Sequence, residues 1–411
     1  MPKPTSAADP TAVRLVVVTL DNHLAGAVDR ARHALQRELP NLALCFHAAA
    51  DWNDDPSALE RCRADIDEGD IILATMLFME DHIQAVLPAL QARRDTCDAM
   101  IGCMSAGEIV RLTRLGRFTM DGSRGGPLAL LKRLRGSNKR QSGSSGAQQM
   151  AMLRRLPRIL RFIPGTAQDV RAYFLTLQYW LAGSDDNVTN LVRFLIDRYA
   201  DGDRRSLRGR LKAAAPVEYP DVGVYHPRLP GRIAERSDRL PGGPDGTVGL
   251  LLMRSYVLAG NTAHYDGVIA ALEARGLGVV PAFASGLDAR PAAERFFLSQ
   301  GRPTVDAVLS LTGFSLVGGP AYNDARAAED MLAGLDVPYL AAQAVEFQTL
   351  EQWEASDRGL LPVEATMMVA IPELDGATGP MLFGGRSEAA PVEHARDMQV
   401  HSERAAALAA R

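Results

Sequence analysis

The side chains best suited to chemistry lie between residues 254 and 348, in segments that follow predicted strands. Arginine can grip a carboxylate through two parallel hydrogen bonds, and histidine or glutamate can accept a proton. Glutamate and asparagine oxygens also suit a hard cation such as Mg²⁺. The candidates are Arg254, Asn261, His264, Tyr265, Ser285, Asp288, Thr312, Phe314, Gln343, Glu346 and Gln348.

Two roles are predicted within this set. His264 and Glu346 are the predicted catalytic proton acceptors. The predicted substrate contacts are Arg254, Asn261, Tyr265, Phe314 and Gln348, and no metal ligand is assigned. The alternative is structural: Asn261 and Thr262 cap a helix, and Glu346 is an exposed cap.

These residues must be positioned by a repeated strand–helix pattern. Val248–Met253 is a predicted buried strand, followed by a polar loop to Thr262, an amphipathic helix and a second strand at Gly278–Ala284. Gly276 supplies the stop of the helix. Open parallel sheets bind ligands beyond the carboxyl ends of their strands, so the candidate residues lie where a site is expected.

The same pattern continues to the C-terminus. The predicted strands are Val305–Leu311, Pro338–Ala342, Val363–Ile371 and Met381–Phe383, with a helix at Asn323–Leu335 and a loop at Gln343–Gln348. Residues 405–411 resemble the start of a helix that lacks a stop signal, which predicts that the sequence is the front part of something larger.

An earlier α/β unit is predicted at residues 1–120. Its predicted strands are Val13–Leu20, Leu42–Ala48, Asp70–Thr75 and Ala99–Cys103, and a helix follows each, the last at Ser105–Leu115. This alternation is typical of a doubly wound, flavodoxin-like sheet. His23 and His82 lie at its strand ends, where capping or surface roles are the favoured interpretation.

The remaining segments complete the predicted organisation. Residues 121–149 are a flexible basic loop, 150–200 are helical, 201–246 are a linker rich in Pro, Gly and Arg, 247–387 form the second α/β domain, and 388–411 begin a helix leading to a missing body. The fold class is α/β, with two doubly wound parallel-sheet units.

Composition and missing motifs exclude several function classes. The chain has 411 residues, 47% of them hydrophobic, and a net charge of −4, which gives no reason to expect nucleic acid as a partner. No apolar run approaches the ~20 residues that span a bilayer, so a cytoplasmic location is expected. None of the four lysines is followed by Ser or Thr, so a Walker A phosphate loop is missing. Any ATP must be bound by another subunit.

Long segments of the sequence resemble the large (H) subunit of protoporphyrin IX magnesium chelatase of the bacteriochlorophyll-type pathway. They are TMLFMEDHI (75–83), CMSAGEIVRLTRLGRF (103–118), LPRILRFIPGTAQDVRAYFLTLQYWLAGSDDNVTNLVRF (156–194), RSYVLAGNTAHYDGVIAALEARG (254–276), VDAVLSLTGFSLVGGPA (305–321), LDVPYLAAQAVEFQTLEQW (335–353) and VAIPELDG (369–376). They cover nearly the whole chain in the family's order.

The resemblance implies binding of protoporphyrin IX and insertion of Mg²⁺, the metal substrate, in bacteriochlorophyll biosynthesis. It also implies two AAA+ type partner subunits, one of which hydrolyses ATP, and a location that is cytoplasmic or peripheral to the photosynthetic membrane. Family members are much longer, so this chain alone is expected to be inactive, and no catalytic residue is transferred. The alternatives are a non-catalytic docking module for the motor subunits, using the loop at Lys132–Arg140, and a cobaltochelatase relative acting on a corrinoid precursor.

Overall fold

The computed structural model describes residues 11–52, 55–120, 155–319, 322–389 and 397–411. Its chain divides at Glu218 and Tyr219 into two compact units, which are described separately. The predicted flexible loop at 121–149 lies outside the described residues, as does the beginning of the helix predicted from Met150; residues 155–160 of that helix are helical.

The first unit is built on a sheet with the strand order β2-β1-β3-β4-β5-β6. Strands β1 (Val13–Thr19), β2 (Leu42–Ala48), β3 (Ile71–Thr75) and β4 (Ala99–Cys103) are parallel. The order of these four strands is that of flavodoxin-like sheets, which confirms the predicted α/β class. Continuous apolar sequence in β1 and β3 reflects burial of both faces of the sheet.

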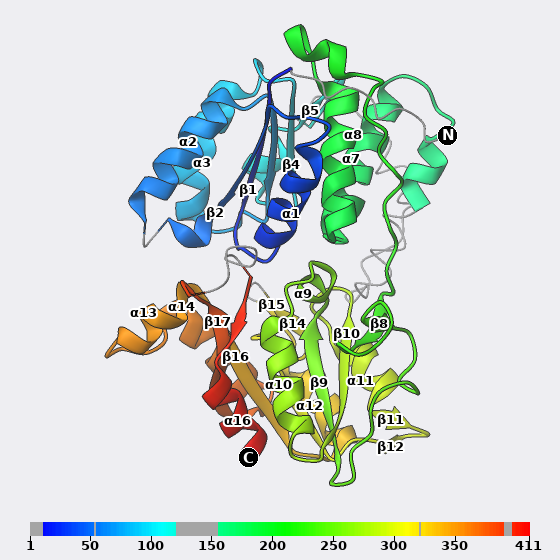
Figure 1. Cartoon of the computed structure of the whole chain (residues 1–411), viewed down its shortest axis with the longest axis vertical. Coiled ribbons are helices and arrows are strands. Elements are labelled where there is room, and N and C mark those ends of the chain that lie inside the picture. The colour runs from blue at the N-terminus through cyan, green and yellow to red at the C-terminus, as the bar shows by residue number, and fades with distance from the viewer. Residues whose placement is uncertain (1–10, 53–54, 121–154, 320–321, 390–396) are drawn as a thin grey trace. The chain divides into compact units, whose positions relative to one another are not determined.

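Helices cover both faces of this sheet (Figure 1). Helices α2 (Pro56–Glu68) and α3 (Glu80–Arg93) pack on one face, and α1 (Ala25–Leu35), α7 (Thr166–Leu181) and α8 (Asp185–Tyr199) lie on the other. Capping explains where two of them begin: Asp55 accepts a hydrogen bond from the Ser57 amide, and Ser184 accepts one from the Asn187 amide.

The prediction of a helix at Ser105–Leu115 is wrong. Only α4 (Gly107–Val110) is helical, and the chain then forms a hairpin of β5 (Arg114–Leu115) and β6 (Phe118–Thr119), which turns at Gly116 with φ 56°. Thr113 Oγ1 exchanges hydrogen bonds of 3.0 Å with the amide and the carbonyl of Gly102. This link fixes the segment against β4 and competes with the helix.

The second unit has an eight-stranded sheet with the order β18-β17-β16-β13-β9-β10-β7-β8. The parallel strands are β9 (Thr247–Met253), β10 (Gly278–Ala284), β13 (Ala307–Ser310), β16 (Tyr339–Thr349) and β17 (Thr378–Arg386). The antiparallel strands β7 (Val222–Tyr225), β8 (Ile233–Ala234) and β18 (Gln399–Val400) form its edges, so part of the predicted linker joins the sheet.

This sheet also has a hydrophobic core on each face. Helices α10 (Ala263–Glu273) and α16 (Ser402–Ala410) supply one core, and α11 (Arg290–Phe296) and α12 (Ala325–Leu335) supply the other. From β9 the chain first adds β10 on one side, and it later returns to add β13 on the other side. The topological switch point is therefore between β9 and β13.

Three local predictions in the second unit are wrong. Residues 363–371 are helical, in α14 (Pro362–Glu364), a π-helical segment at Ala365–Ala370 and α15 (Ile371–Leu374). The predicted polar loop after β9 contains α9 (Arg254–Leu258), and the predicted loop at 343–348 lies within β16. Short apolar runs do not distinguish a helix from a strand, and Gln343 and Gln348 are polar residues that are buried within β16.

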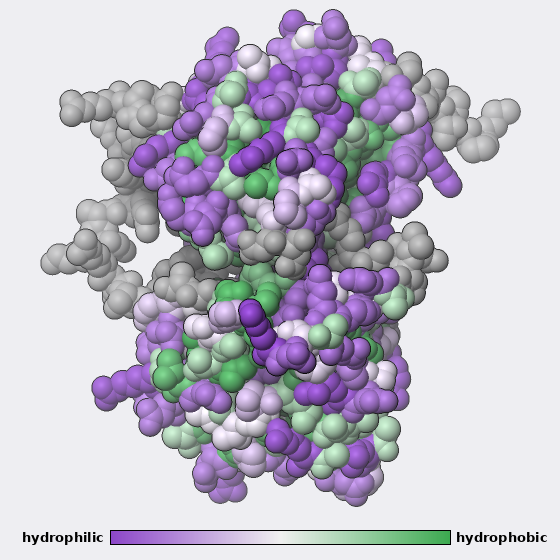
Figure 2. Space-filling model, turned by 90° about the vertical axis from the view of Figure 1, so that its left-hand side faces the viewer, coloured by the Kyte–Doolittle hydropathy of each residue, from purple (hydrophilic) through white to green (hydrophobic). Residues whose placement is uncertain are grey.

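Polar residues dominate the surface shown in Figure 2, where hydrophobic residues form only separate islands on each unit. Among the described residues, none of the helices combines the length and the apolar character needed to cross a lipid bilayer.

Candidate functional site

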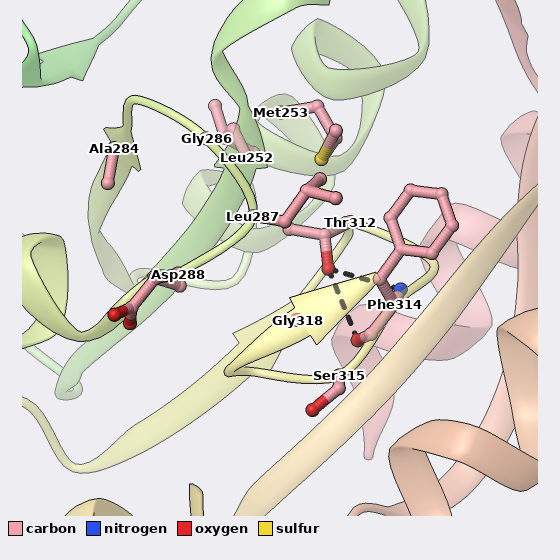
Figure 3. Close-up of a pocket in the computed structure, with 11 residues that line it drawn as sticks. Leu252, Met253, Ala284, Gly286, Leu287, Asp288, Thr312, Phe314, Ser315 and Gly318 are labelled. Atoms are coloured by element: carbon pink, nitrogen blue, oxygen red, sulfur yellow. Dashed lines mark hydrogen bonds between the residues drawn. The ribbon is translucent and has the colours of Figure 1, made fainter. Parts of the chain in front are cut away.

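The carboxyl ends of β9, β10 and β13 surround a shallow pocket in the second unit (Figure 3). It is lined by Leu252, Met253, Ala284, Gly286, Leu287, Asp288, Ala289, Thr312, Phe314, Ser315 and Gly318. The pocket coincides with the switch point of the sheet, which is where open α/β sheets bind their ligands.

The side chains that converge on this pocket are mainly apolar. Met253, Leu287 and Phe314 point toward one another in Figure 3, whereas the Asp288 carboxylate points away and binds Arg290 at 2.7 Å. Leu287 is 45% exposed, so the mouth presents apolar surface to solvent. Such a pocket suits an apolar portion of a ligand.

Thr312 provides the polar group of the pocket and shapes the loop after β13. Its Oγ1 lies 3.0 Å from Ser310 Oγ and accepts a hydrogen bond of 3.3 Å from the Phe314 amide. The loop turns at Gly313, where φ is 69°. These bonds fix the backbone from which Phe314 projects into the pocket.

Arg254 serves a different purpose from the predicted carboxylate grip. Its side chain is buried at the start of α9. Its guanidinium donates hydrogen bonds of 2.8 Å to the Pro220 carbonyl and 3.2 Å to the Tyr219 carbonyl. These bonds hold the strand end of β9 to the segment that enters β7.

His264 and Tyr265 lie inside an aromatic cluster, with Tyr256 and Phe383. The His264 ring centroid is 3.8 Å from that of Tyr265, 5.4 Å from that of Tyr256 and 5.9 Å from that of Phe383. Burial lowers the pKa of His264 to about 3, so the imidazole is neutral at physiological pH. Its Nδ1 is buried without a hydrogen-bond partner among the described residues.

Glu346 is half-buried on β16 and accepts a hydrogen bond from the Tyr256 hydroxyl. The contact joins residues that are 90 positions apart in the sequence. Because the Tyr256 ring also contacts His264, the structure brings both predicted proton acceptors into contact with one tyrosine. Tyr256 was not among the predicted site residues.

The two predicted amide contacts hold backbone and neighbouring side chains. Asn261 Oδ1 accepts a hydrogen bond of 2.7 Å from the Met398 amide. Gln348 Nε2 donates to Glu364 Oε2 at 2.5 Å and to the Gly359 carbonyl at 3.3 Å. Both side chains are buried, and Asn261 Nδ2 has no hydrogen-bond partner among the described residues.

Of the seven predicted site residues, Phe314 lines the pocket, together with Asp288 and Thr312 from the wider set. The other six do not line the pocket and make the contacts described above. Sequence reasoning missed Met253 and Leu287, since apolar residues at strand ends carry no distinctive signal. In the described ranges, no group of three or more His, Cys, Asp or Glu side chains is arranged to hold a metal ion.

The histidines at the strand ends of the first unit have local partners. His23 pairs with Asp21. His82 is buried with its ring centroid 5.8 Å from that of Trp52, and burial lowers its pKa.

Two doubly wound sheets, the second with a candidate ligand pocket at its switch point, place the chain in the α/β class. Comparison with known families is more specific. Residues 177–411 match the family described as CobN/Magnesium Chelatase, and residues 14–174 match a family described as Domain of unknown function (DUF3479). The chain therefore belongs to the CobN/magnesium chelatase family, as the sequence resemblance predicted.

Individual relatives agree with this assignment. The magnesium-chelatase H subunit of Cereibacter sphaeroides is 53% identical over 91% of this chain and 31% of its own length. The chloroplastic magnesium-chelatase subunit ChlH of Oryza sativa subsp. indica is 34% identical over 94% of this chain and 29% of its own. The chain thus spans about a third of the length of these relatives.

A solved structure shares the fold. The catalytic subunit of cobaltochelatase from Mycobacterium tuberculosis matches 97% of this chain and 27% of its own, with a TM-score of 0.50 and 20% sequence identity.

Proposed function

We propose that this chain forms part of the large subunit of magnesium chelatase and that its second unit contacts protoporphyrin IX. The observation that supports this most strongly is 53% identity to a magnesium-chelatase H subunit over 91% of the chain. Magnesium is preferred over cobalt because magnesium-chelatase subunits are 53% and 34% identical over more than nine-tenths of the chain, whereas the cobaltochelatase subunit is 20% identical. Mg²⁺ is then the metal substrate.

The pocket at the switch point is the proposed contact for the macrocycle. Met253, Leu287 and Phe314 offer apolar surface for one edge of a flat tetrapyrrole. Burial of this surface supplies affinity, while the carboxylates of the ligand stay in water, because Arg254 already binds backbone carbonyls.

Tyr256 and Glu346 are the proposed proton-handling pair. Glu346 accepts a hydrogen bond from the Tyr256 hydroxyl. Its carboxylate can also accept the proton that a pyrrole nitrogen releases when the metal ion binds to that nitrogen. His264 remains neutral and orients Tyr256 through its ring contact. In this proposal ATP is bound by AAA+ type partner subunits, and the location is cytoplasmic or peripheral to the photosynthetic membrane.

Fluorescence titration of this chain with protoporphyrin IX tests the proposed contact. We expect Phe314→Ala to weaken binding about tenfold, since about 1.5 kcal/mol of apolar contact is lost. Phe78→Ala is the matched control, because Phe78 is an exposed phenylalanine (57%) in the other unit. Equal affinities for the wild type and Phe314→Ala would refute the pocket as the contact.

A second candidate function, docking of the motor subunits, is favoured by one observation. Phe78 and Met79 are consecutive apolar residues beyond the carboxyl end of β3, with exposures of 57% and 43%. A pull-down of purified AAA+ chelatase subunits by this chain is then expected to fail for Phe78→Ala and to persist for Phe314→Ala. The two variants therefore separate the two candidates.

A further inference from the structure

Residues 155–163 of the first unit present a row of apolar side chains to solvent. Ile159, Phe162 and Ile163 are 54%, 83% and 43% exposed. Leu156 and Leu160 in the same segment are 6% and 1% exposed. The segment is therefore anchored by one apolar face while it exposes another, and exposed phenylalanine side chains at this level are a mark of interaction surfaces.

Helix α7 holds this segment firmly in place. Gln168 Nε2 donates to the carbonyl of Leu160 at 2.8 Å and to that of Ile163 at 2.5 Å. Arg171 Nε donates to the Pro157 carbonyl at 3.1 Å. These donors satisfy backbone carbonyls at the end of the helical turn, so Phe162 projects from a fixed backbone.

The charge around this apolar row is positive. Arg155, Arg158 and Arg161 are exposed, and residues 155–168 contain no acidic residue. Arg158 Nη2 lies 2.9 Å from Glu218 Oε1, and both side chains are exposed. Such a surface pair is weak, so Arg158 can leave Glu218 for another anion at little cost in free energy. The arginines alternate with Ile159 and Phe162 along the same exposed stripe.

We propose that this face, residues 155–163, binds the surface of an anionic lipid bilayer. Interfacial segments insert phenylalanine and aliphatic side chains at the boundary between headgroups and acyl chains, while arginines reach back to the phosphates. A bilayer satisfies both kinds of side chain at once, because its anionic and apolar layers lie one above the other. Three arginines and no acidic residue among residues 155–168 make this face complementary to an extended anionic surface.

The proposal rests only on the peripheral location suggested above, and it is independent of the tetrapyrrole pocket, which belongs to the other unit. It is tested by flotation of the full chain with vesicles of phosphatidylcholine alone or mixed with phosphatidylglycerol. The wild type is expected to float with the mixed vesicles and to be released by salt. Phe162→Ser is expected to reduce partitioning about tenfold, and Leu374→Ser is the control, because Leu374 is an exposed apolar residue (68%) in the other unit.

The double variant Arg155→Gln, Arg161→Gln separates the electrostatic contribution to bilayer binding from the apolar contribution. This double variant is expected to lose the preference for phosphatidylglycerol and the dependence on salt. All substituted side chains are exposed, so an unchanged circular dichroism melt and unchanged porphyrin titration are expected for each variant. Failure of the wild type to float, or equal flotation of wild type and Phe162→Ser, overturns the proposal. A third outcome also overturns the proposal. If phosphatidylglycerol has no effect on flotation and only an acidic protein partner abolishes it, the face is assigned to protein docking.

Discussion

A buried ion pair in the first unit is a sensitive test of what stabilises the fold. Arg204 donates from Nε to Asp98 Oδ2 and from Nη2 to Asp98 Oδ1, each at 3.0 Å. The same Nη2 lies 3.2 Å from Asp70 Oδ1. The side chains of Asp98, Asp70 and Arg204 are 6%, 11% and 24% exposed, so one cation neutralises two nearly buried carboxylates.

Replacing Arg204 with alanine leaves these carboxylates without their shared cation. Breaking a fully buried pair costs about 3–5 kcal/mol. Arg204 retains partial exposure, so we expect the free energy of unfolding to fall by about 3 kcal/mol at neutral pH. Burial already raises the pKa of Asp70. The folded state of the variant then binds a proton more readily than the unfolded state, so its deficit shrinks as the pH falls toward 5.

Urea unfolding followed by tryptophan fluorescence measures this change. The three tryptophans are Trp52 and Trp180 in the first unit and Trp353 in the second. A Trp353→Phe background therefore restricts the signal to the unit that contains Arg204.

Arg61→Ala is the control for this measurement. Arg61 and Asp55 also form a pair in the first unit, at 2.8 Å, but their side chains are 60% and 48% exposed. The control is expected to cost less than about 1 kcal/mol. A loss for Arg204→Ala no larger than that of the control, or a deficit that grows as the pH falls, would refute the reasoning from burial.

Three further predictions concern the second unit and are measured by unfolding followed at Trp353. Between pH 7 and pH 5 the wild type is expected to lose about 2 kcal/mol of stability, because the pKa of His264 is depressed in the folded state and the unfolded state therefore binds the proton first. His264→Phe is expected to remove this loss, and an unchanged pH dependence would contradict the prediction. Phe383→Ala is expected to cost about 3–5 kcal/mol, since Phe383 is 0% exposed, and a loss below 1 kcal/mol would show that the aromatic cluster is loosely packed. Gly249→Ala is expected to cost about 1–3 kcal/mol, because its new Cβ meets the Phe297 ring at 2.8 Å; a neutral effect would mean that this ring moves freely.

The sheets were predictable where burial on both faces produced continuous apolar runs. β1 and β9 are such runs, and both were predicted to within one residue at each end. The run at 363–371 is equally apolar but forms helical turns instead. Glu364 makes the difference: its buried carboxylate accepts hydrogen bonds from the Leu361 and Phe347 amides, which fixes the chain at the helix start. That contact depends on the position of β16, which local sequence does not reveal.

The site was predictable only as a location. General rules place ligands at the carboxyl ends of parallel strands, and the pocket with Phe314 and Thr312 lies there. The orientation of each side chain depends on partners distant in the sequence. Arg254 turns toward carbonyls 34 and 35 residues earlier, and Glu346 meets a tyrosine 90 residues earlier. The partners of Arg254 are backbone carbonyls, and no local sequence signal pairs Tyr256 with Glu346.

The orientation of Arg254 also changes what the site can recognise. A pocket lined by Arg254 would select a ligand by its carboxylates, whereas in the proposed contact Met253, Leu287 and Phe314 would select by apolar area. Ligands that differ only in their carboxylate substituents should then bind this chain with similar affinities, while loss of planarity should weaken binding. Comparing protoporphyrin IX with its dimethyl ester in the same titration measures this directly. A large preference for the free acid would require a cation at the pocket, and the reasoning from Arg254 would be wrong.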